Sequence, residues 1–389
     1  KSNCDMGEWK EYKLGDITSK ITSGGTPKSS EANYYDGNIP WLNTKEVNFN
    51  RIARTEKCIT EEGLNNSSAK WIPKGSVIIA MYGATAAKVA YSLIDLTTNQ
   101  ACCNLIIDID IADSQFVYYY IQSSYEELLN LACGAAQQNL SVGVIADFPI
   151  LLPPLAEQKH IASILTSLDD KIDLLHSENA TLEAMAETLF RQWFIEEAKE
   201  DWKEISLTKV ANFLNGLACQ KYPPKNEIEK LPVLKIRELS NGIGDDSDWA
   251  TTDITSEYII HAGDVIFAWS ASLMVKIWDG EDCILNQHLF KVTSYKYPKW
   301  FYYLWCKHHL NEFIAIAQSH ATTMGHIKRS DLESAIVLIP SNKELMMMNE
   351  QMDGMLLKIE NNNRQLQTLI KVRNGLLPKL INREISIYG

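Results

Sequence analysis

The sequence has no long apolar run, since no segment reaches the roughly 18 consecutive apolar residues that a membrane-spanning helix requires. Residues 1–9 are polar and lack the apolar core of a secretory signal peptide. The eight cysteines show no Cys-x-x-Cys spacing, and several stand inside apolar segments. These absences predict a cytoplasmic protein with no membrane partner, whose cysteines are buried free thiols.

The sequence also lacks an excess of positive charge. Its 37 Lys and Arg residues and 49 Asp and Glu residues give a net charge of −12, which argues against a simple basic nucleic-acid binder. It has no GxxxxGK[S/T] loop for ATP, and no glycine-rich turn follows a strand to hold a cofactor. The pairs His308-His309 and His320 with His326 are not at metal-ligand spacing with supporting cysteines. We therefore predict no catalytic residue, no metal site and no cofactor in this chain.

What the sequence does contain is an internal repeat. Five segments recur in the same order at offsets of 193, 192, 188, 187 and 187 residues. The first copies begin at Trp9, Ile39, Gly75, Asn99 and Ile150, and the second copies begin at Trp202, Leu231, Gly263, Asn286 and Val337. The same comparison matches Lys88 with Lys276. Two copies are too few for a solenoid, so the repeat predicts a duplicated domain.

Each copy opens with a segment that mixes strands and helices. Apolar runs at 75–81 and 102–109 predict buried strands, and residues 114–131 have the length of a helix. In the second copy the corresponding ranges are 263–269, 283–292 and 299–317. Aromatic residues of the first helical range are predicted to lie in the core, namely Phe116, Tyr119 and Tyr120.

Each copy closes with a segment in which apolar residues alternate at spacings of four and three, the pattern of a heptad seam. The first seam consists of Ile161, Leu165, Leu168, Ile172, Leu175, Asn179, Leu182, Ala186 and Leu189. The second seam, 187 residues later, consists of Met348, Met352, Met355, Ile359, Asn362, Leu366, Leu369, Arg373 and Leu376. Each segment of about 38 residues would form a helix about 55 Å long. We expect the two helices to bury their seams on each other.

Charge favours this pairing. Residues 156–198 have a net charge of −6, and residues 341–389 have a net charge of +2. Opposite charges favour association of the two helices over self-association of either one. An antiparallel, centred pair would place Asn179 near Asn362, where a polar pair fixes the register. The alternative is that these asparagines are partly exposed and hydrogen-bond to water.

Six segments resemble the specificity subunit of Type I restriction–modification systems, and the likeness extends over nearly the whole chain. These segments are Trp9–Ile17, Ile39–Leu42, Trp71–Gly75, Asn99–Gln100, Gln137–Ser141 and Leu152–Gln158. The last of them, at the junction into the first long helix, is the most specific. The second copy departs from the pattern, because residues 340–344 lack the second proline and the glutamine.

The resemblance implies an α+β fold with an internal pseudo-two-fold repeat. Two tandem α/β target recognition domains, residues 1–155 and 199–340, would each be followed by a long helix, residues 156–198 and 341–389. The two helices would form an antiparallel coiled coil that spaces the domains, and each domain would read one half of a split, asymmetric target in double-stranded DNA. Implied partners are two methyltransferase subunits that modify adenine, which a restriction–translocase subunit can join. S-adenosylmethionine and ATP with Mg²⁺ are expected only on these partners.

Sequence readout requires polar and cationic side chains on loops at the edge of a DNA groove. In the first domain the candidate DNA-binding residues are Thr26, Lys28, Asn43, Thr44, Lys45, Tyr82, Thr85, Lys88, Gln137, Gln138 and Asn139. In the second domain they are Lys221, Tyr222, Lys235, Arg237, Ser270, Ser272, Lys276, Thr322, Thr323, His326 and Lys328. Lys88 and Lys276 keep the charge in both copies, which suits phosphate contact, whereas Asn43 and Lys235 differ, which suits base choice. The alternative for each residue is a solvated or turn-capping side chain.

Three other functions remain open. A self-contained DNA methyltransferase or nuclease is disfavoured, because residues 152–155 lack the asparagine of the Asn-Pro-Pro-Phe/Tyr motif that grips a flipped adenine. A structural adaptor with protein-binding modules and a modification-only complex without a nuclease are the others. Residues 1–155 contain 12 basic and 17 acidic residues, and residues 199–340 contain 15 and 18. We therefore expect weak, salt-sensitive DNA binding by this chain alone.

Overall fold

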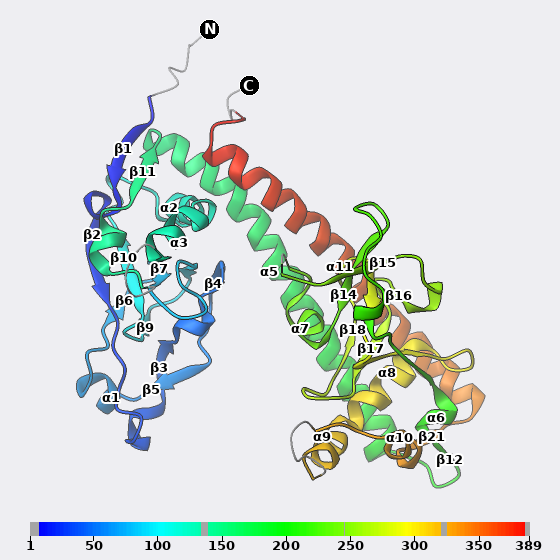
Figure 1. Ribbon diagram of the computed structural model, residues 1–389. Coiled ribbons are helices and arrows are strands. Elements are labelled where there is room, and N and C mark those ends of the chain that lie inside the picture. Colours follow the sequence, from blue (N-terminus) through cyan, green and yellow to red (C-terminus); the bar gives the residue numbers. More distant parts are fainter. Residues whose placement is uncertain (1–7, 134–138, 245, 320–324, 386–389) are drawn as a thin grey trace. The chain divides into compact units, whose positions relative to one another are not determined.

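The computed structural model describes residues 8–133, 139–244, 246–319 and 325–385 (Figure 1). The chain forms two compact units. Unit 1 comprises Lys1–Lys171 and Ile370–Gly389, and unit 2 comprises Ile172–Leu369. Two long helices, α5 (Leu155–Arg191) and α11 (Asn342–Ile381), each contribute residues to both units.

The described part of unit 1 contains sheets with the strand orders β1-β11, β2-β10-β7-β8-β4 and β5-β3-β9-β6. The strands are β1 (Lys10–Lys13), β2 (Thr18–Ser23), β3 (Tyr35–Leu42), β4 (Asn50–Ile52), β5 (Lys57–Ile59), β6 (Trp71–Ile72), β7 (Val77–Ala80), β8 (Val89–Ser92), β9 (Leu96–Thr98), β10 (Cys102–Ile107) and β11 (Pro149–Leu152). The helices are α1 (Glu61–Asn65), α2 (Ser114–Ser123), α3 (Tyr125–Cys133), α4 (Val142–Ala146) and the start of α5.

The described part of unit 2 repeats this topology with the strand orders β12-β21, β13-β20-β17-β18 and β15-β14-β19-β16. The strands are β12 (Lys203–Ser206), β13 (Asn212–Asn215), β14 (Lys230–Leu234), β15 (Trp249–Thr251), β16 (Ile259–Ile260), β17 (Val265–Ala268), β18 (Met274–Ile277), β19 (Cys283–Leu285), β20 (Leu289–Thr293) and β21 (Ile336–Ile339). The helices besides α5 and α11 are α6 (Leu207–Val210), α7 (Ile236–Asn241), α8 (Lys299–His308), α9 (Leu310–Ser319) and α10 (Arg329–Ser334). The parallel pair β3·β9 corresponds to the parallel pair β14·β19. The predicted duplication is therefore confirmed, and among the described strands β4 alone has no counterpart.

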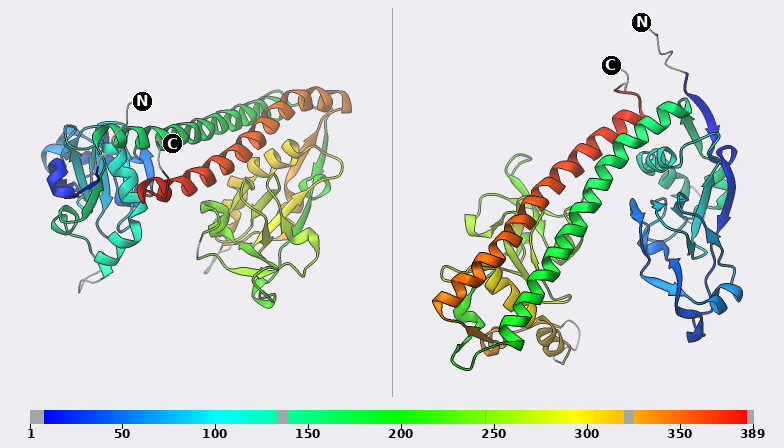
Figure 2. Two further views of the ribbon diagram at one scale, coloured as in Figure 1. Left: turned by 90° about the horizontal axis from the view of Figure 1, so that it is seen from above. Right: turned by 180° about the vertical axis from the view of Figure 1, so that it is seen from behind.

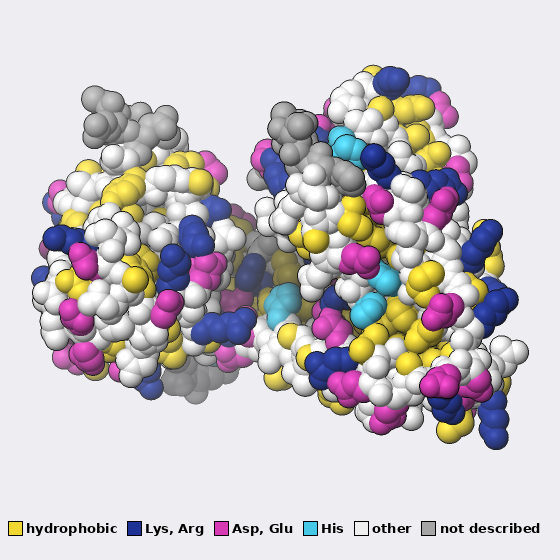
Figure 3. All heavy atoms as spheres, turned by 90° about the horizontal axis from the view of Figure 1, so that it is seen from below, with side chains coloured by type: hydrophobic (Ala, Val, Ile, Leu, Met, Phe, Trp, Pro, Cys, Tyr) yellow, Lys and Arg dark blue, Asp and Glu magenta, His cyan; other side chains and the backbone are white. Residues whose placement is uncertain are grey.

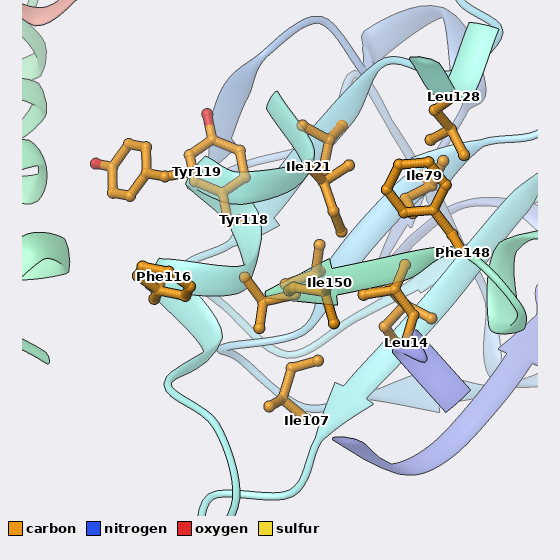
Figure 4. Close-up of a cluster of buried hydrophobic side chains, with 14 of the residues drawn as sticks. Leu14, Ile79, Ile107, Phe116, Tyr118, Tyr119, Ile121, Leu128, Phe148 and Ile150 are labelled. Atoms are coloured by element: carbon orange, nitrogen blue, oxygen red, sulfur yellow. The ribbon is translucent and has the colours of Figure 1, made fainter. Parts of the chain in front are cut away.

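Strand β7 lies between two hydrophobic clusters, and its alternating side chains enter both of them. Val77 and Ile79 belong to the larger cluster of unit 1, while Ile78 and Ala80 belong to a smaller one. Figure 4 shows the larger cluster, in which Ile79 lies among side chains from β10, α2, α3 and β11. Strand β17 alternates in the same way in unit 2. A strand buried on both faces explains why the sequence there is continuously apolar.

Two details differ from the sequence-based expectation. The helical ranges 114–131 and 299–317 are each divided into two helices, α2 with α3 and α8 with α9. The range 283–292 is not one strand but two, β19 and β20, which belong to different sheets. The intervening turn at 286–288 lets the chain cross from one sheet to the other. The expected burial of cysteines is confirmed for Cys102, Cys103, Cys219, Cys283 and Cys306.

Helices α5 and α11 lie side by side and antiparallel within each unit (Figures 1 and 2). In unit 1 the start of α5 packs with the end of α11 in one core, through Ile161, Leu165, Leu377, Leu380 and Ile381. In unit 2 the end of α5 packs with the start of α11, through Ala186, Phe190, Met348 and Met352. Every residue of the two predicted seams is buried or partly buried. The residue after the last seam position, Leu377, is buried more deeply than the predicted Leu376.

The predicted asparagine pair is present in unit 2. Asn362 Nδ2 donates to Asn179 Oδ1 at 2.9 Å, and Asn179 Nδ2 donates to Asn363 Oδ1 at 2.6 Å. Asn179 and Asn362 are 9% and 2% exposed, so they bond to protein rather than to bulk water. Within the described residues no helix is both long and apolar enough to cross a membrane.

Candidate nucleic-acid interface

The segments that hold the candidate residues of unit 1 meet at one turn, Thr98–Cys102, between β9 and β10 (the unit 1 turn). Backbone hydrogen bonds join this turn to three other segments: Gly25 N to Thr98 O (2.8 Å), Asn99 N to Leu42 O (2.9 Å) and Met81 N to Ala101 O (2.8 Å). Leu140 N in turn donates to Met81 O at 2.8 Å. The turn therefore gathers the segments of Thr26, Asn43, Tyr82 and Asn139, which are far apart in the sequence.

Side-chain hydrogen bonds also join these segments at the unit 1 turn. The buried Asn99 donates from Nδ2 to Thr44 Oγ1 at 3.2 Å, and its Oδ1 accepts from Ala101 N at 3.2 Å. Thr85 Oγ1 donates to the carbonyl oxygen of Thr44 at 2.9 Å. Thr26 donates from its hydroxyl to Gln100 Oε1. The first three predicted regions of unit 1 are thus joined by hydrogen bonds in one cluster.

Unit 2 has an equivalent turn, Leu285–Leu289, between β19 and β20 (the unit 2 turn). Its backbone bonds reproduce those of unit 1: Leu217 N to Leu285 O (2.9 Å), Asn286 N to Leu234 O (3.2 Å) and Trp269 N to His288 O (3.4 Å). Ile327 N donates to Trp269 O at 3.1 Å, which brings the segment of His326 and Lys328 to the same place. The predicted regions of unit 2 therefore converge as those of unit 1 do.

A glycine stands against each turn because the backbones approach too closely for a side chain. A Cβ atom on Gly24 would lie 2.2 Å from Thr98 O, and one on Gly216 would lie 2.3 Å from Asn286 O. Both distances are far below normal contact with backbone, which cannot swing aside as a flexible side chain can. The glycines at 24 and 216 therefore fix how the first segment reaches each turn.

Several candidate cations have partners inside their own unit. The contacts are Lys45 with Glu56 (2.5 Å), Lys88 with Asn48 (2.7 Å), Lys235 with Asp248, Arg237 with Glu238 (2.6 Å) and Asp246 (2.5 Å), and Lys276 with Asp279 (3.1 Å). Exposed ion pairs of this kind contribute little to stability. A phosphate group could therefore replace these partners at small cost, except for Glu238, which is 1% exposed.

The match between Lys88 and Lys276 is wrong. Val77 and Val265 are equivalent starts of β7 and β17, and they pair with Tyr91 and Ile277. One position further along these strand pairs, Lys276 lies opposite Ile266, and Ala90 lies opposite Ile78. Lys276 is therefore equivalent to Ala90 and not to Lys88. The paired residues Val77 and Tyr91 are 14 positions apart and Val265 and Ile277 are 12 apart, so the hairpin of unit 2 is two residues shorter and a match at constant offset fails there. A phosphate contact shared by these two lysines is no longer supported.

The match between Asn43 and Lys235 is confirmed. Each follows the strand that pairs in parallel with the strand before the turn, and each precedes a short helix. The carboxylate of Glu46 accepts from Asn43 N at 3.0 Å, and that of Glu238 accepts from Lys235 N at 3.3 Å. Asn43 Oδ1 also accepts from Lys45 N at 3.1 Å, so its side chain caps the turn as the alternative interpretation expected.

The remaining candidates are placed differently. Exposed side chains belong to Thr26, Lys28, Asn139, Lys221, Tyr222, Ser272, His326 and Lys328. Tyr82 is half-buried against the core, and Ser270 is buried with its hydroxyl 3.1 Å from His288 Nδ1. Four candidates, Gln137, Gln138, Thr322 and Thr323, lie outside the described residues. Gln100 and Gln287 were not among the predicted DNA-binding residues, although the repeated Asn-Gln pair lies at the centre of both clusters.

On the face that Figure 3 shows, Lys and Arg side chains are interspersed with Asp and Glu side chains on both units. Within the described residues no group of three His, Cys, Asp or Glu side chains could hold a metal ion. Burial raises the pKa of the Cys103 thiol to about 12 and that of Cys219 to about 11, so both thiols stay protonated near neutral pH.

The paired turns, the two long helices and the duplicated sheets agree with a sequence comparison. A family described as "Type I restriction modification DNA specificity domain" matches residues 6–184 and 199–371. The chain belongs to this family.

This specificity-domain chain resembles one relative over nearly its whole length and another over less than half of it. It is 26% identical over 412 residues to the Type I restriction enzyme MjaIX specificity subunit of Methanocaldococcus jannaschii, covering 98% of this chain and 94% of the relative. It is 30% identical over 168 residues to the EcoR124I/EcoR124II specificity subunit of Escherichia coli, covering 42% and 41%. The crystal structure of a Type I restriction–modification S subunit from M. genitalium shares the fold, with a TM-score of 0.57 at 15% identity over 98% of each chain.

The residues that carried the specificity-subunit resemblance at the helix junction have a structural role. Gln158 is 1% exposed, donates from Nε2 to Pro153 O at 2.9 Å and accepts from Asp113 N at 2.8 Å. It therefore ties the start of α5 to the start of α2. Unit 2 lacks this glutamine but keeps another contact, since Trp9 donates to Glu157 at 3.4 Å and Trp202 donates to Glu344 at 3.2 Å.

Proposed function

We propose that this chain is the sequence-specific DNA-binding specificity subunit of a Type I restriction–modification complex, and that it reads a bipartite, asymmetric target. The observation that supports this most is the pair of equivalent turns, around which the two units place different side chains. Residues 24–28 differ from 216–222, Asn43 is replaced by Lys235, and the hairpin loops differ in length. Because base edges are read by the side chains that reach them, one framework with two sets of loops would read two different half-sites.

The chain would act without catalysis of its own and would scaffold the subunits that modify and cut DNA. Two methyltransferase subunits would bring S-adenosylmethionine, and restriction–translocase subunits would bring the ATP and Mg²⁺ sites. Membership of the specificity-domain family supports this division of labour. Such a complex would work on DNA in the cytoplasm.

Neither unit has an excess of basic residues, so partner subunits would supply much of the phosphate neutralisation. The isolated chain should bind DNA weakly and lose affinity steeply between about 50 and 200 mM salt. Mobility-shift assays with and without the methyltransferase subunits measure this, and tight binding by the isolated chain at the higher salt would contradict it.

Exchange of a whole recognition segment tests the function directly. Residues 1–155 are replaced by the corresponding segment of another family member, and DNA methylated by the assembled complex is sequenced. One half of the methylated target should change while the other half stays. Replacement of residues 199–340 is the matched control and should change the other half. An unchanged target after both exchanges would contradict the proposal.

A further inference from the structure

Gln100 and Gln287 occupy the same position in the two turns. Each follows a buried asparagine that holds the turn through its backbone, since Asn99 N and Asn286 N donate to the equivalent carbonyls of Leu42 and Leu234. Gln100 is exposed and Gln287 is partly exposed. The segments around the turns differ between the units, while this side chain is the same. A side chain common to two different readers is placed to contact something that both half-sites share.

In unit 1 the glutamine offers a hydrogen-bond donor. Its Oε1 accepts from the hydroxyl of Thr26, which fixes the side chain at the centre of the cluster. Among the described residues no atom accepts a hydrogen bond from its Nε2 group. An exposed N–H donor without an acceptor can donate to an oxygen atom from outside the chain.

In unit 2 the glutamine amide also has a donor to spare. Gln287 Nε2 lies 3.4 Å from His288 Nε2, and the hydroxyl of Ser270 lies 3.1 Å from His288 Nδ1. With the ring proton on Nδ1, His288 donates to Ser270 and its Nε2 accepts one N–H of Gln287. The second N–H of this amide has no acceptor among the described residues. An oxygen atom from outside the chain can accept from it.

From this arrangement, and resting on the proposed function, we infer that Gln100 and Gln287 donate to phosphodiester oxygens at matched positions of the two half-sites. They would set the register of each unit on DNA, while the differing loops around them read the bases. The backbone of DNA is the feature that two half-sites of different sequence share. Phosphate contacts fix position and orientation without conveying sequence.

The test uses the chain assembled with its methyltransferase partners. The variants are Gln100→Ala, Gln287→Ala and, as a control, Gln351→Ala at an exposed position of α11. Affinity is measured for the target duplex, for a duplex of unrelated sequence, and for target duplexes with a single methylphosphonate at each backbone position. Loss of one hydrogen bond to an ionised phosphate oxygen should weaken binding about tenfold to hundredfold. The loss should be equal for target and unrelated DNA, and the methylated sequence should not change.

The methylphosphonate series identifies the contact. One modified phosphate per half-site should weaken binding by the wild-type complex and have no further effect on the corresponding glutamine variant, while the Gln351→Ala complex should behave as the wild type. Relaxed specificity at one base pair would overturn the inference in favour of base reading, and unchanged affinity would overturn it outright. A wild-type complex that prefers no DNA sequence would contradict the proposed function itself, which is a different result from either.

Discussion

The two units pack against helices α5 and α11 with different side chains, which are polar in unit 1 and apolar in unit 2. In unit 1, Asp169 of α5 is 5% exposed and accepts from Tyr119 OH at 2.6 Å and from Arg373 Nη1 at 3.0 Å. Helices α5 and α11 are related by an offset of 187 residues, and α2 and α8 by an offset of 185. The equivalents of this polar triad in unit 2 are therefore Leu304, Leu356 and Ala186, which belong to one hydrophobic cluster.

The comparison shows that the same fold can use either a polar or an apolar set of side chains at equivalent positions. Burial and the neighbouring Asp169 carboxylate raise the pKa of Tyr119, so its hydroxyl stays a donor at all moderate pH values. A buried carboxylate is tolerated only with all its partners, whereas apolar side chains need only to fill the space. The polar triad should therefore be sensitive to loss of any one member, and the apolar triad should respond in proportion to the volume removed.

The largest effect is expected from Asp169→Ala. This variant leaves Arg373 without its carboxylate and Tyr119 without its acceptor, and it should lower the free energy of unfolding by about 3–5 kcal/mol. The matched variant Leu356→Ala in unit 2 should cost about 2–4 kcal/mol, mainly from the cavity. Urea unfolding of the full chain, followed by native-state hydrogen exchange in each unit, separates the two. If Asp169→Ala cost less than 1 kcal/mol, the polar triad would not hold unit 1 as argued.

The next largest effect is expected from substitution of the glycines that contact the two turns. Gly24→Ala in unit 1 and Gly216→Ala in unit 2 each force a backbone shift at the turn, at a cost of about 1–3 kcal/mol. Each variant should disturb recognition of one half-site and leave the other intact, which methylation of hybrid targets can report. Gly354→Ala is the control, because its Cβ meets nothing within 4 Å and the change should stabilise α11 by up to about 1 kcal/mol.

A smaller, pH-dependent effect on stability is expected at the start of α11 in unit 2. Hydrogen bonds from Lys199 and Ser341 lower the pKa of Glu344 to about 2, below its ordinary value of 4.5. A lowered pKa means that the contribution of Glu344 is present above pH 4.5 and is lost as the pH falls towards 2. Glu344→Gln should remove about 1 kcal/mol or less at neutral pH and flatten the acid limb of the stability profile. Thermal unfolding from pH 2 to 7 measures this, with Glu157→Gln of unit 1 as the control.

The smallest effect is expected from exchanging the whole triad. In this variant, Tyr119→Leu, Asp169→Leu and Arg373→Ala together give unit 1 the same apolar side chains that unit 2 has at the equivalent positions. Replacement of a complete buried ionic set by apolar side chains is often neutral or stabilising, so the change in unfolding free energy should stay within about 1 kcal/mol or be favourable. A loss as large as that of Asp169→Ala would show that the two positions are not equivalent.

The sequence predicted the repetitive parts of the molecule well. The heptad spacing identified both helices, their antiparallel pairing and the contact of Asn179 with Asn362, because a seam repeats one simple geometric rule. The duplication of the sheets followed from matched apolar runs. Regions near the turn were also found, since polar residues beside buried strands stand out against an apolar background.

The features that could not be predicted from the sequence depend on contacts between distant segments. The matching of Lys276 failed because a hairpin loop can lose two residues without any local signal. The polar triad was missed because Asp169 lies one position outside the predicted seam and its partner Tyr119 belongs to another element. The central role of the Asn-Gln pair became visible only when the backbone bonds of the turn were known, although its recurrence in both copies was the available signal.

The two equivalent turns should present two different sets of reading loops to DNA. Sequencing of modified bases in DNA from cells that express the chain with its methyltransferase partners tests this most directly. We expect one methylated target made of two different half-sites separated by a gap of fixed length and unspecified sequence. A single continuous target, two identical half-sites, or the same target after exchange of residues 1–155 would contradict it.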